Sequence, residues 1–433
     1  MSALLDAFAR AFDALAQPDA ADLGDSRRNA RDALLRDGLP AARSEAWKYT
    51  SLRALERRAF ATVSDVAADS VALDALLAAI PAPRMVFVDG RFDAARSDVS
   101  ALPAGADALP LSRVLREQEP RDANFLQRRY AGADAWPAVA NAVLAEEGAV
   151  IRVDHGVVCE TPLHLVFVVS DANAEAATHL RHFVDLRNDA VLTLCEHHLA
   201  LGAHAGLSNH VAHVHVGQRA RLAHARLQHA HAGTHAFART DAALAREADY
   251  RRVDLELGAA LSRHELNVRL EGEGAKLFAN GVLLADGKRH LDTRLDIEHI
   301  ARDTSCDLLW RGLGAGRGRA VFHGGITIRE GADGTDANLS NKNLLLSANA
   351  EIDTQPVMVI HADEVKAAHG ATVGQLDPTA LFYLRSRGLP EAEARAMLTG
   401  AFCREVLSAI EHAELRALLT ASLDRALAGV VAA

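Results

Sequence analysis

The chain has 433 residues and a formal net charge of −10 at pH 7. This length is enough for two or three domains with a large core, and the acidic balance argues against nucleic acid as a partner. No apolar run approaches the ~20 residues that a membrane span requires. The first residues lack the basic start and apolar core of a secretion signal. We therefore expect a cytoplasmic protein that binds neither nucleic acid nor a membrane.

The N-terminal region, residues 1–137, is predicted to be helical and mixed. A first helix is indicated by an apolar stripe made of Leu4, Leu5, Phe8, Phe12 and Leu15. A second helix around 30–35 should end at Gly38. Trp47 and Tyr49 are expected to anchor the following segment, because their polar tips need hydrogen-bond partners. The sequence RMVFVDGRF at 84–92 predicts a strand, a turn and a second strand.

The central region, residues 138–362, is predicted to be a series of short strands, since apolar and polar residues alternate along it. The predicted strands are 149–153, 163–169, 182–186, 190–194, 210–216, 221–228, 250–257, 264–270, 275–279, 295–300, 321–328 and 356–360. Turn residues separate them, but tight hairpin dipeptides such as Asn280-Gly281 are scarce. This scarcity favours crossover turns and a parallel solenoid, although the pattern alone leaves a sandwich open.

Histidines gather in this region, with fourteen of the 21 between His155 and His235. His213 and His215 alternate along one predicted strand and should share a face, where two imidazoles could bind zinc. The alternative is that both face solvent, and we favour it because no cysteine or carboxylate completes a familiar ligand spacing. The four cysteines, Cys159, Cys195, Cys306 and Cys403, form no CxxC pair and are expected to be buried thiols.

Two alternative functions apply to the central region: a polysaccharide-active β-helix enzyme and a histidine-rich metal-binding protein. Asp292, Asp296 and Glu298 could line a solenoid face and cleave a polysaccharide, but the absence of a secretion signal counts against that function. The glycine-rich run at 312–320 lacks the spacing of a nucleotide-binding fingerprint and is interpreted as a turn. The chain also lacks a GxxxxGK[ST] P-loop. A function that uses energy from ATP would therefore need a partner to supply it.

The C-terminal region, residues 363–433, is predicted to contain three helices. In the second helix, Pro390 suits the first turn, and an apolar stripe follows at Ala394, Leu398, Ala401, Phe402 and Val406. Such a stripe packs against its own domain or docks a partner. Leu398 and Phe402 are the candidate docking residues.

Several motifs together resemble those of one protein family. They are RSEAWKYTSL at 43–52, HVAHVHVGQRARLAHARLQ at 210–228, LDTRLDIEH at 291–299, and the pair HGATVG at 369–374 and LFYLRSRG at 381–388. The chain is similar in these segments to the SufB/SufD family of iron–sulfur cluster assembly proteins, and most like its SufD members, since the cysteine motifs expected of SufB are absent. The resemblance covers most of the chain.

The resemblance implies a mainly β fold with flanking α: a right-handed parallel β-helix between N- and C-terminal helical regions. It also implies a non-catalytic scaffold that pairs with a SufB-like paralogue and docks a SufC-like ATPase on its C-terminal helices. In the absence of these partners, the protein could form a homodimer. No intrinsic cofactor is implied. A transient iron–sulfur cluster is expected at the partner interface, and reduced flavin is linked to such complexes without a site that the sequence locates.

The family's interface histidine matches His369. The motif often has a cysteine two positions earlier, whereas this chain has Ala367 and Ala368 before the histidine, which removes a thiolate from this point. An imidazole nitrogen can replace a thiolate on iron, and Gly370 permits close approach of another backbone. On residues alone, the alternative is a structural histidine at a strand-to-helix corner.

Overall fold

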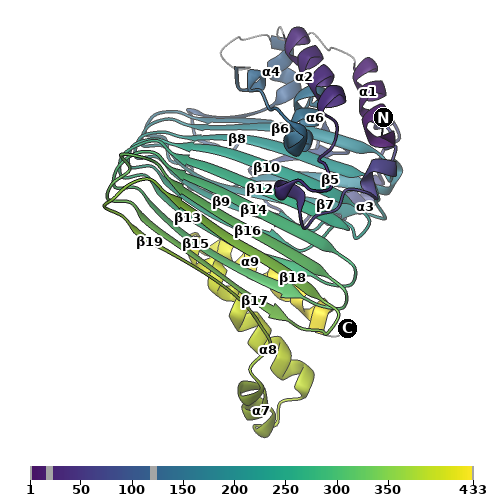
Figure 1. Cartoon of the computed structure of the whole chain (residues 1–433). Helices are drawn as coiled ribbons and strands as arrows, with labels where there is room; N and C mark the ends of the chain where they lie inside the picture. The colour runs from purple at the N-terminus through teal and green to yellow at the C-terminus, as the bar shows by residue number, and fades with distance from the viewer. Residues whose placement is uncertain (1, 16–22, 118–123, 432–433) are drawn as a thin grey trace.

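The computed structural model describes residues 2–15, 23–117 and 124–431, and its centre is a β-solenoid (Figure 1). The strands in the described part of the chain are β1 (Arg84–Val88), β2 (Arg91–Phe92), β3 (Ala106–Pro110), β4 (Ala149–Val153), β5 (Leu163–Ser170), β6 (Ala177–Leu186), β7 (Val191–Leu201), β8 (Leu207–Val216), β9 (Arg221–Gln228), β10 (His235–Leu244), β11 (Asp249–Glu256), β12 (Leu261–Leu270), β13 (Lys276–Ala285), β14 (His290–His299), β15 (Ser305–Gly314), β16 (Arg319–Ile328), β17 (Asp336–Leu345), β18 (Glu351–Ile360) and β19 (Lys366–Gly374).

From β4 onward, successive strands alternate between two sheets. The odd-numbered strands from β5 on, together with β1 and β2, form a 10-stranded sheet in the order β19-β17-β15-β13-β11-β9-β7-β5-β1-β2. The even-numbered strands from β4 on, together with β3, form a 9-stranded sheet that ends in β4-β3. Pairing from β4 to β19 is parallel and in register. Paired residues lie from 26 positions apart, as in His235 with Leu261, to 33 apart, as in Val150 with Phe183. This variation in turn length hides the repeat in the sequence.

The interior of the solenoid is filled by every second residue of each strand. Side chains from both sheets form one continuous apolar cluster, among them Leu194 and Trp310 of the 10-stranded sheet and Leu266 and Ile297 of the 9-stranded sheet. Strand side chains point alternately to opposite faces, so the residues between them face outward. Helices cover part of these outward faces, and many outward residues are polar, as Asp296 and Glu298 of β14 are.

The N-terminal region covers the outer face of the 9-stranded sheet. Its elements are α1 (Ala3–Asp13), α2 (Gly24–Asp37), α3 (Ser70–Leu77), α4 (Leu111–Glu117), α6 (Trp136–Leu144) and the 3-10 turns η2 (Glu45–Trp47), η3 (Leu55–Arg57), η4 (Asn124–Gln127) and η5 (Ala133–Ala135), with η6 (Asp171–Asn173) between β5 and β6. Trp47 and Trp136 pack over Phe237 of β10, and the indole of Trp47 donates to the Asp134 carbonyl at 3.1 Å. The exception is α3, which packs with Ile80 on β1 and β5 of the other sheet.

The C-terminal region covers the outer face of the 10-stranded sheet. It comprises α7 (Pro378–Ser386), α8 (Glu391–Arg404), η7 (Glu405–Ala409) and α9 (Ala413–Val431). Apolar residues of η7 and α9 pack on outward residues of β9, β11 and β13, such as Leu227, Leu255 and Val282. Helix α7 and the start of α8 project beyond the end of the solenoid (Figure 1). No helix in the described ranges combines the length and apolar character needed to cross a membrane.

The predicted solenoid is confirmed, with differences at the level of strands. The sequence analysis missed β10, β15, β17 and β19, which are rich in alanine, glycine or asparagine and therefore have low strand propensity. Hydrogen-bond ladders with the adjacent strands hold these four strands in place. The solenoid also continues past residue 362, since β19 pairs with β17, and β1 and β3 from the N-terminal region pair with β5 and β4. The predicted strand–turn–strand at 84–92 is confirmed.

Candidate functional site at the open end of the solenoid

The solenoid ends in an open rung, which we call the last rung and define as β18 and β19. Each of these strands has a parallel strand partner on one side only, β16 and β17 respectively, and each ends its sheet. Val359, Ile360 and Val373 on this rung are 41%, 45% and 43% exposed. An edge strand offers unpaired N–H and C=O groups to another chain, so this rung has the chemistry of a strand-pairing interface.

His369 lies in the middle of β19, opposite Leu339 of β17. Leu339 belongs to the interior cluster, so His369 continues the row of inward-facing positions, but it is exposed because no further rung covers it. The expected strand-to-helix corner is therefore wrong: the chain is extended here, and α7 begins only at Pro378. A Cβ on the adjacent Gly370 would meet no atom within 4 Å. Another backbone thus has room to approach beside the imidazole.

An asparagine pair closes the interior immediately behind the last rung. Asn343 donates to Asn341 at 2.6 Å and to the Thr372 carbonyl of β19 at 2.9 Å, while Thr354 of β18 donates to Asn341 at 2.7 Å. These bonds tie β17 to both strands of the last rung. The open end is therefore an ordered surface on which His369 has a fixed position.

His369 receives no help from this chain's own thiols. Cys159, Cys195, Cys306 and Cys403 are free and buried, as expected. Cys306 pairs with Ala337 of β17, which in turn pairs with Ala367 of β19, so the thiol lies two strands further from the open end. It bonds His299 at 3.3 Å. A single imidazole cannot complete the ligand set of a cluster.

The predicted docking residues lie nearer to their own solenoid than expected. Leu398 and Phe402 are both half-buried, Phe402 packs against the apolar cluster under α9, and the Arg311 guanidinium lies 5.2 Å from its ring centroid. The apolar residues that α7 and α8 expose are instead Phe382, Tyr383 and Met397, at 72%, 56% and 50%. The sequence analysis placed its apolar stripe on α8 alone, on a different face from Met397, and assigned no exposed apolar face to α7.

The histidines do not gather at one surface. His213 is buried, not solvent-facing, and accepts a hydrogen bond from Arg181 at 3.1 Å, whereas His215 is exposed and bonds Asp185 at 2.9 Å. Burial and the nearby Arg181 cation lower the pKa of His213 well below its usual value. The two side chains share a face, as predicted, but His213 lies under the ring of Phe125 and beside Tyr130.

Other histidines belong to a charged network inside the solenoid that the sequence analysis did not foresee. Glu196 accepts from His198 and His224 at 3.0 and 2.9 Å. Further along, Arg252 donates to both oxygens of Asp254 at 2.8 and 2.9 Å. Burial alone would raise the pKa of Glu196, but the bonds from the two histidines hold it well below its usual value. The signal was present: these polar residues share inward positions with Leu194, Leu222 and Tyr250.

The carboxylates considered for polysaccharide cleavage do not form an open site. Asp292 is buried and accepts hydrogen bonds from Thr50 at 2.6 Å and Arg263 at 2.9 Å. The N-terminal segment around η2 therefore covers it. Asp296 and Glu298 lie further along the same outward face of β14, but without Asp292 they offer no accessible pair next to a cleft.

Comparisons with known proteins agree with this architecture. Residues 167–402 match the family described as SUF system FeS cluster assembly, SufBD core domain, and residues 1–165 match the SufBD protein N-terminal region. The chain is 32% identical to the iron–sulfur cluster assembly protein SufD of Escherichia coli over 92% of its length and 91% of that protein. It is 29% identical to a SufBD family protein of Synechocystis over 92% of its length and 89% of that protein.

Proposed function

Because this chain belongs to the SufBD family of iron–sulfur cluster assembly proteins and is SufD-like, we propose that it is a non-catalytic scaffold subunit of a three-component assembly complex. It pairs through its last rung with a SufB-like paralogue and docks a SufC-like ATPase through its C-terminal helices. Without the paralogue, the same unpaired edge would let two copies of the chain pair. The nascent cluster is cargo held where the two solenoids meet, and reduced flavin remains a proposed electron source without an assigned site.

The observation that carries this proposal is the exposed histidine on an unpaired parallel edge. His369 supplies one nitrogen donor, and the backbone edge beside it supplies the means to pair with another solenoid. A partner that adds a strand to β19 brings its own side chains opposite His369, since residues on paired strands lie next to one another. The partner then supplies the thiolates that this chain lacks at the open end.

The C-terminal helices suit a separate partner. Phe382, Tyr383 and Met397 are large apolar residues exposed on α7 and α8, and these helices project away from the solenoid (Figure 1). Exposed apolar residues grouped on one element mark interaction sites. This placement supports docking of the ATPase at α7 and α8 without disturbing the last rung.

The role of His369 is tested by His369→Ala in the complex co-expressed with SufB-like and SufC-like subunits. We expect iron and acid-labile sulfide per purified complex to fall several-fold, because one cluster ligand is lost, while subunit composition stays unchanged. His361→Ala is the matched control, since His361 is also exposed at this end of the molecule but follows β18 outside the strand. Wild-type iron and sulfide in the His369 variant would reject the ligand role, and a large loss of thermal stability would indicate a structural one.

A further inference from the structure

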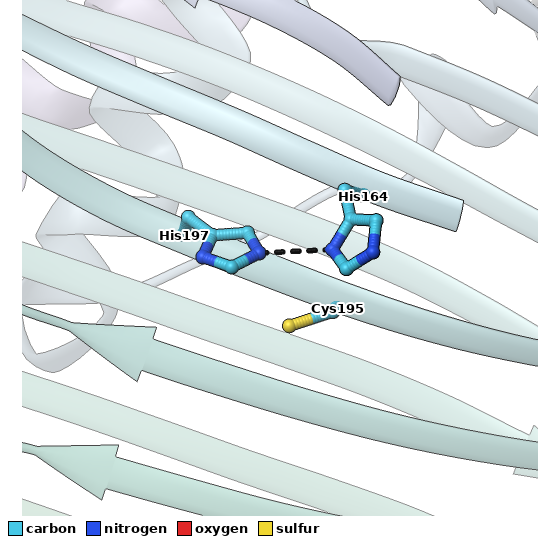
Figure 2. A group of neighbouring side chains, drawn as sticks. All are labelled: His164, Cys195 and His197. Carbon is cyan, nitrogen blue, oxygen red and sulfur yellow. Dashed lines mark hydrogen bonds between the residues drawn. The ribbon is translucent and has the colours of Figure 1, made fainter. Parts of the chain in front are cut away.

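Three potential metal ligands meet on the outer face of the 10-stranded sheet, far along the sheet from the last rung. They are His164 of β5 and Cys195 and His197 of β7, which we call the His–Cys cluster (Figure 2). Their ligand atoms all lie within 4.8 Å of one another. Nδ1 of His164 and Nε2 of His197 are 3.0 Å apart and share a hydrogen bond.

The strand geometry explains why these three side chains converge. Cys195 and His197 are two residues apart on β7 and therefore point to the same face. His164 pairs directly with Cys195 across the parallel ladder, which places neighbouring side chains on the same face. The cluster is thus positioned by the register of β5 and β7.

The cluster is enclosed. His164, Cys195 and His197 are 4%, 0% and 5% exposed. The apolar cluster under α3 lies on one side and the cluster under α9 on the other. Enclosure of this kind excludes water from the three ligand atoms.

The spacing of the two nitrogens is close to that in a tetrahedral zinc site. Two nitrogens bound to one Zn²⁺ lie about 3.3 Å apart, given Zn–N bonds of about 2.0–2.1 Å and tetrahedral angles. The observed separation of the two nitrogens is 3.0 Å. One thiolate and two imidazoles are ligands that Zn²⁺ accepts, whereas Mg²⁺ and Ca²⁺ prefer oxygen. By contrast, the carboxylates of the interior network are already bonded to arginines and histidines.

From this geometry we infer that the His–Cys cluster is a zinc-class metal site, held by Nδ1 of His164, Sγ of Cys195 and Nε2 of His197. On binding, the Cys195 thiol releases one proton and the hydrogen bond between the imidazoles is replaced by two nitrogen–metal bonds. The proton on the donor nitrogen moves to the other nitrogen of its ring. The three side chains supply three of the four positions of a tetrahedral site. A bound ion would tie β5 and β7 together beneath the helices that cover them.

The test uses the full chain stripped of metal with a chelator and then titrated with Zn²⁺ or Co²⁺ alone. We expect about one equivalent to bind, the melting temperature to rise, and Co²⁺ to give a thiolate-to-cobalt charge-transfer band in the near ultraviolet. Cys195→Ser should abolish that band and weaken binding at least about tenfold. Cys306→Ser is the matched control, because Cys306 is also a buried thiol bonded to a histidine, His299, and it should leave binding and band unchanged.

Two results would overturn the inference: no stoichiometric binding to the wild-type chain, or an undiminished cobalt band in Cys195→Ser. The spectrum of the wild-type chain tests the inference even if a variant fails to fold. A cobalt complex without the thiolate-to-cobalt charge-transfer band would exclude Cys195 as a ligand. The outcome is independent of the proposed assembly function, because none of the three residues lies on the last rung.

Discussion

At the scale of single residues, Gly281 and Trp310 show how tightly the interior of the solenoid specifies its side chains. The two residues are paired on β13 and β15, and a Cβ added to Gly281 would lie 2.2 Å from Cζ3 of Trp310. The indole is fully buried and packs on Phe322 with ring centroids 5.5 Å apart. The indole of Trp310 therefore fills the space that a side chain at position 281 would occupy.

We predict that Gly281→Ala destabilises the chain by about 1–3 kcal/mol, because the rigid indole has to move within a close-packed core. The measurement is the urea midpoint of the isolated protein. Gly370→Ala is the control, since a Cβ added at this exposed strand position would meet no atom within 4 Å, and it should unfold like wild type. Equal midpoints for Gly281→Ala and wild type would contradict the packing described here.

Single residues were predicted unevenly from the sequence. His369 was found through its motif, and the structure places it on an exposed strand. The His–Cys cluster was missed because only two of its members, Cys195 and His197, are close in sequence. The third, His164, is 31 positions from Cys195 and reaches it only through the register of the paired strands. Register in a solenoid depends on turn lengths, and these vary from rung to rung.

At the scale of elements, alternation predicted which segments become strands but not where they end. The strand at 221–228 was predicted with the bounds of β9, whereas the segment at 295–300 is only part of β14. Asparagine-rich β17 and alanine-rich β10 carry no strong strand signal. They are strands because each receives ladder hydrogen bonds from neighbours on both sides, a long-range effect that local sequence does not contain.

The C-terminal helices were predicted correctly as three helices, but their exposed faces were not. Truncation after Gly388 would remove α9, whose Leu419 and Leu423 cover the sheet, so it would damage the solenoid as well as any docking site. Point substitutions on α7 and α8 separate the two effects.

We predict that Phe382→Asp combined with Met397→Asp weakens binding of the SufC-like ATPase at least about tenfold, because two exposed apolar contacts become charged. The free energy of unfolding of the isolated chain should stay within about 0.5 kcal/mol of wild type, since both side chains are at the surface. Val71→Asp is the control, as Val71 is 80% exposed on α3. Unchanged ATPase binding by the double variant would remove α7 and α8 as the docking site.

At the scale of the whole molecule, buried neutral histidines link stability to pH. Burial is the main cause that lowers the pKa of His264 to about 3 and those of His182, His204 and His299 to about 4, from an ordinary value of 6.5. Between those values and 6.5 the unfolded chain binds more protons than the folded one. Stability is therefore complete above about pH 6.5 and is lost as the pH falls toward 4.

We predict that the urea midpoint of the isolated protein is flat above about pH 6.5 and falls steeply below it. Each such histidine contributes up to about 1.4 kcal/mol of lost stability per pH unit. Circular dichroism at a series of pH values provides the measurement. A midpoint that stays constant from about pH 7 down to about pH 5 would show that these histidines are accessible to protons in the folded state.

The open edge of the last rung is the feature on which the whole molecule's proposed role depends. The Lys366 N–H donates to the Thr335 carbonyl at 2.8 Å, and alternate residues of a parallel strand bond the same neighbour. The N–H of Ala371 therefore points away from β17 toward the free edge. Ala371→Pro removes that outward donor without removing a bond to β17, and the preceding Gly370 tolerates the restriction that proline imposes.

The most direct measurement is the native mass of the complex purified after co-expression with SufB-like and SufC-like subunits. The account predicts that the wild-type chain and Ala371→Ser, which keeps the N–H, are recovered with the paralogue bound. Ala371→Pro should fold alone with a near-wild-type urea midpoint, but its mass should show that the paralogue is missing. A folded Ala371→Pro chain that still carries the paralogue at full occupancy would contradict pairing through the last rung.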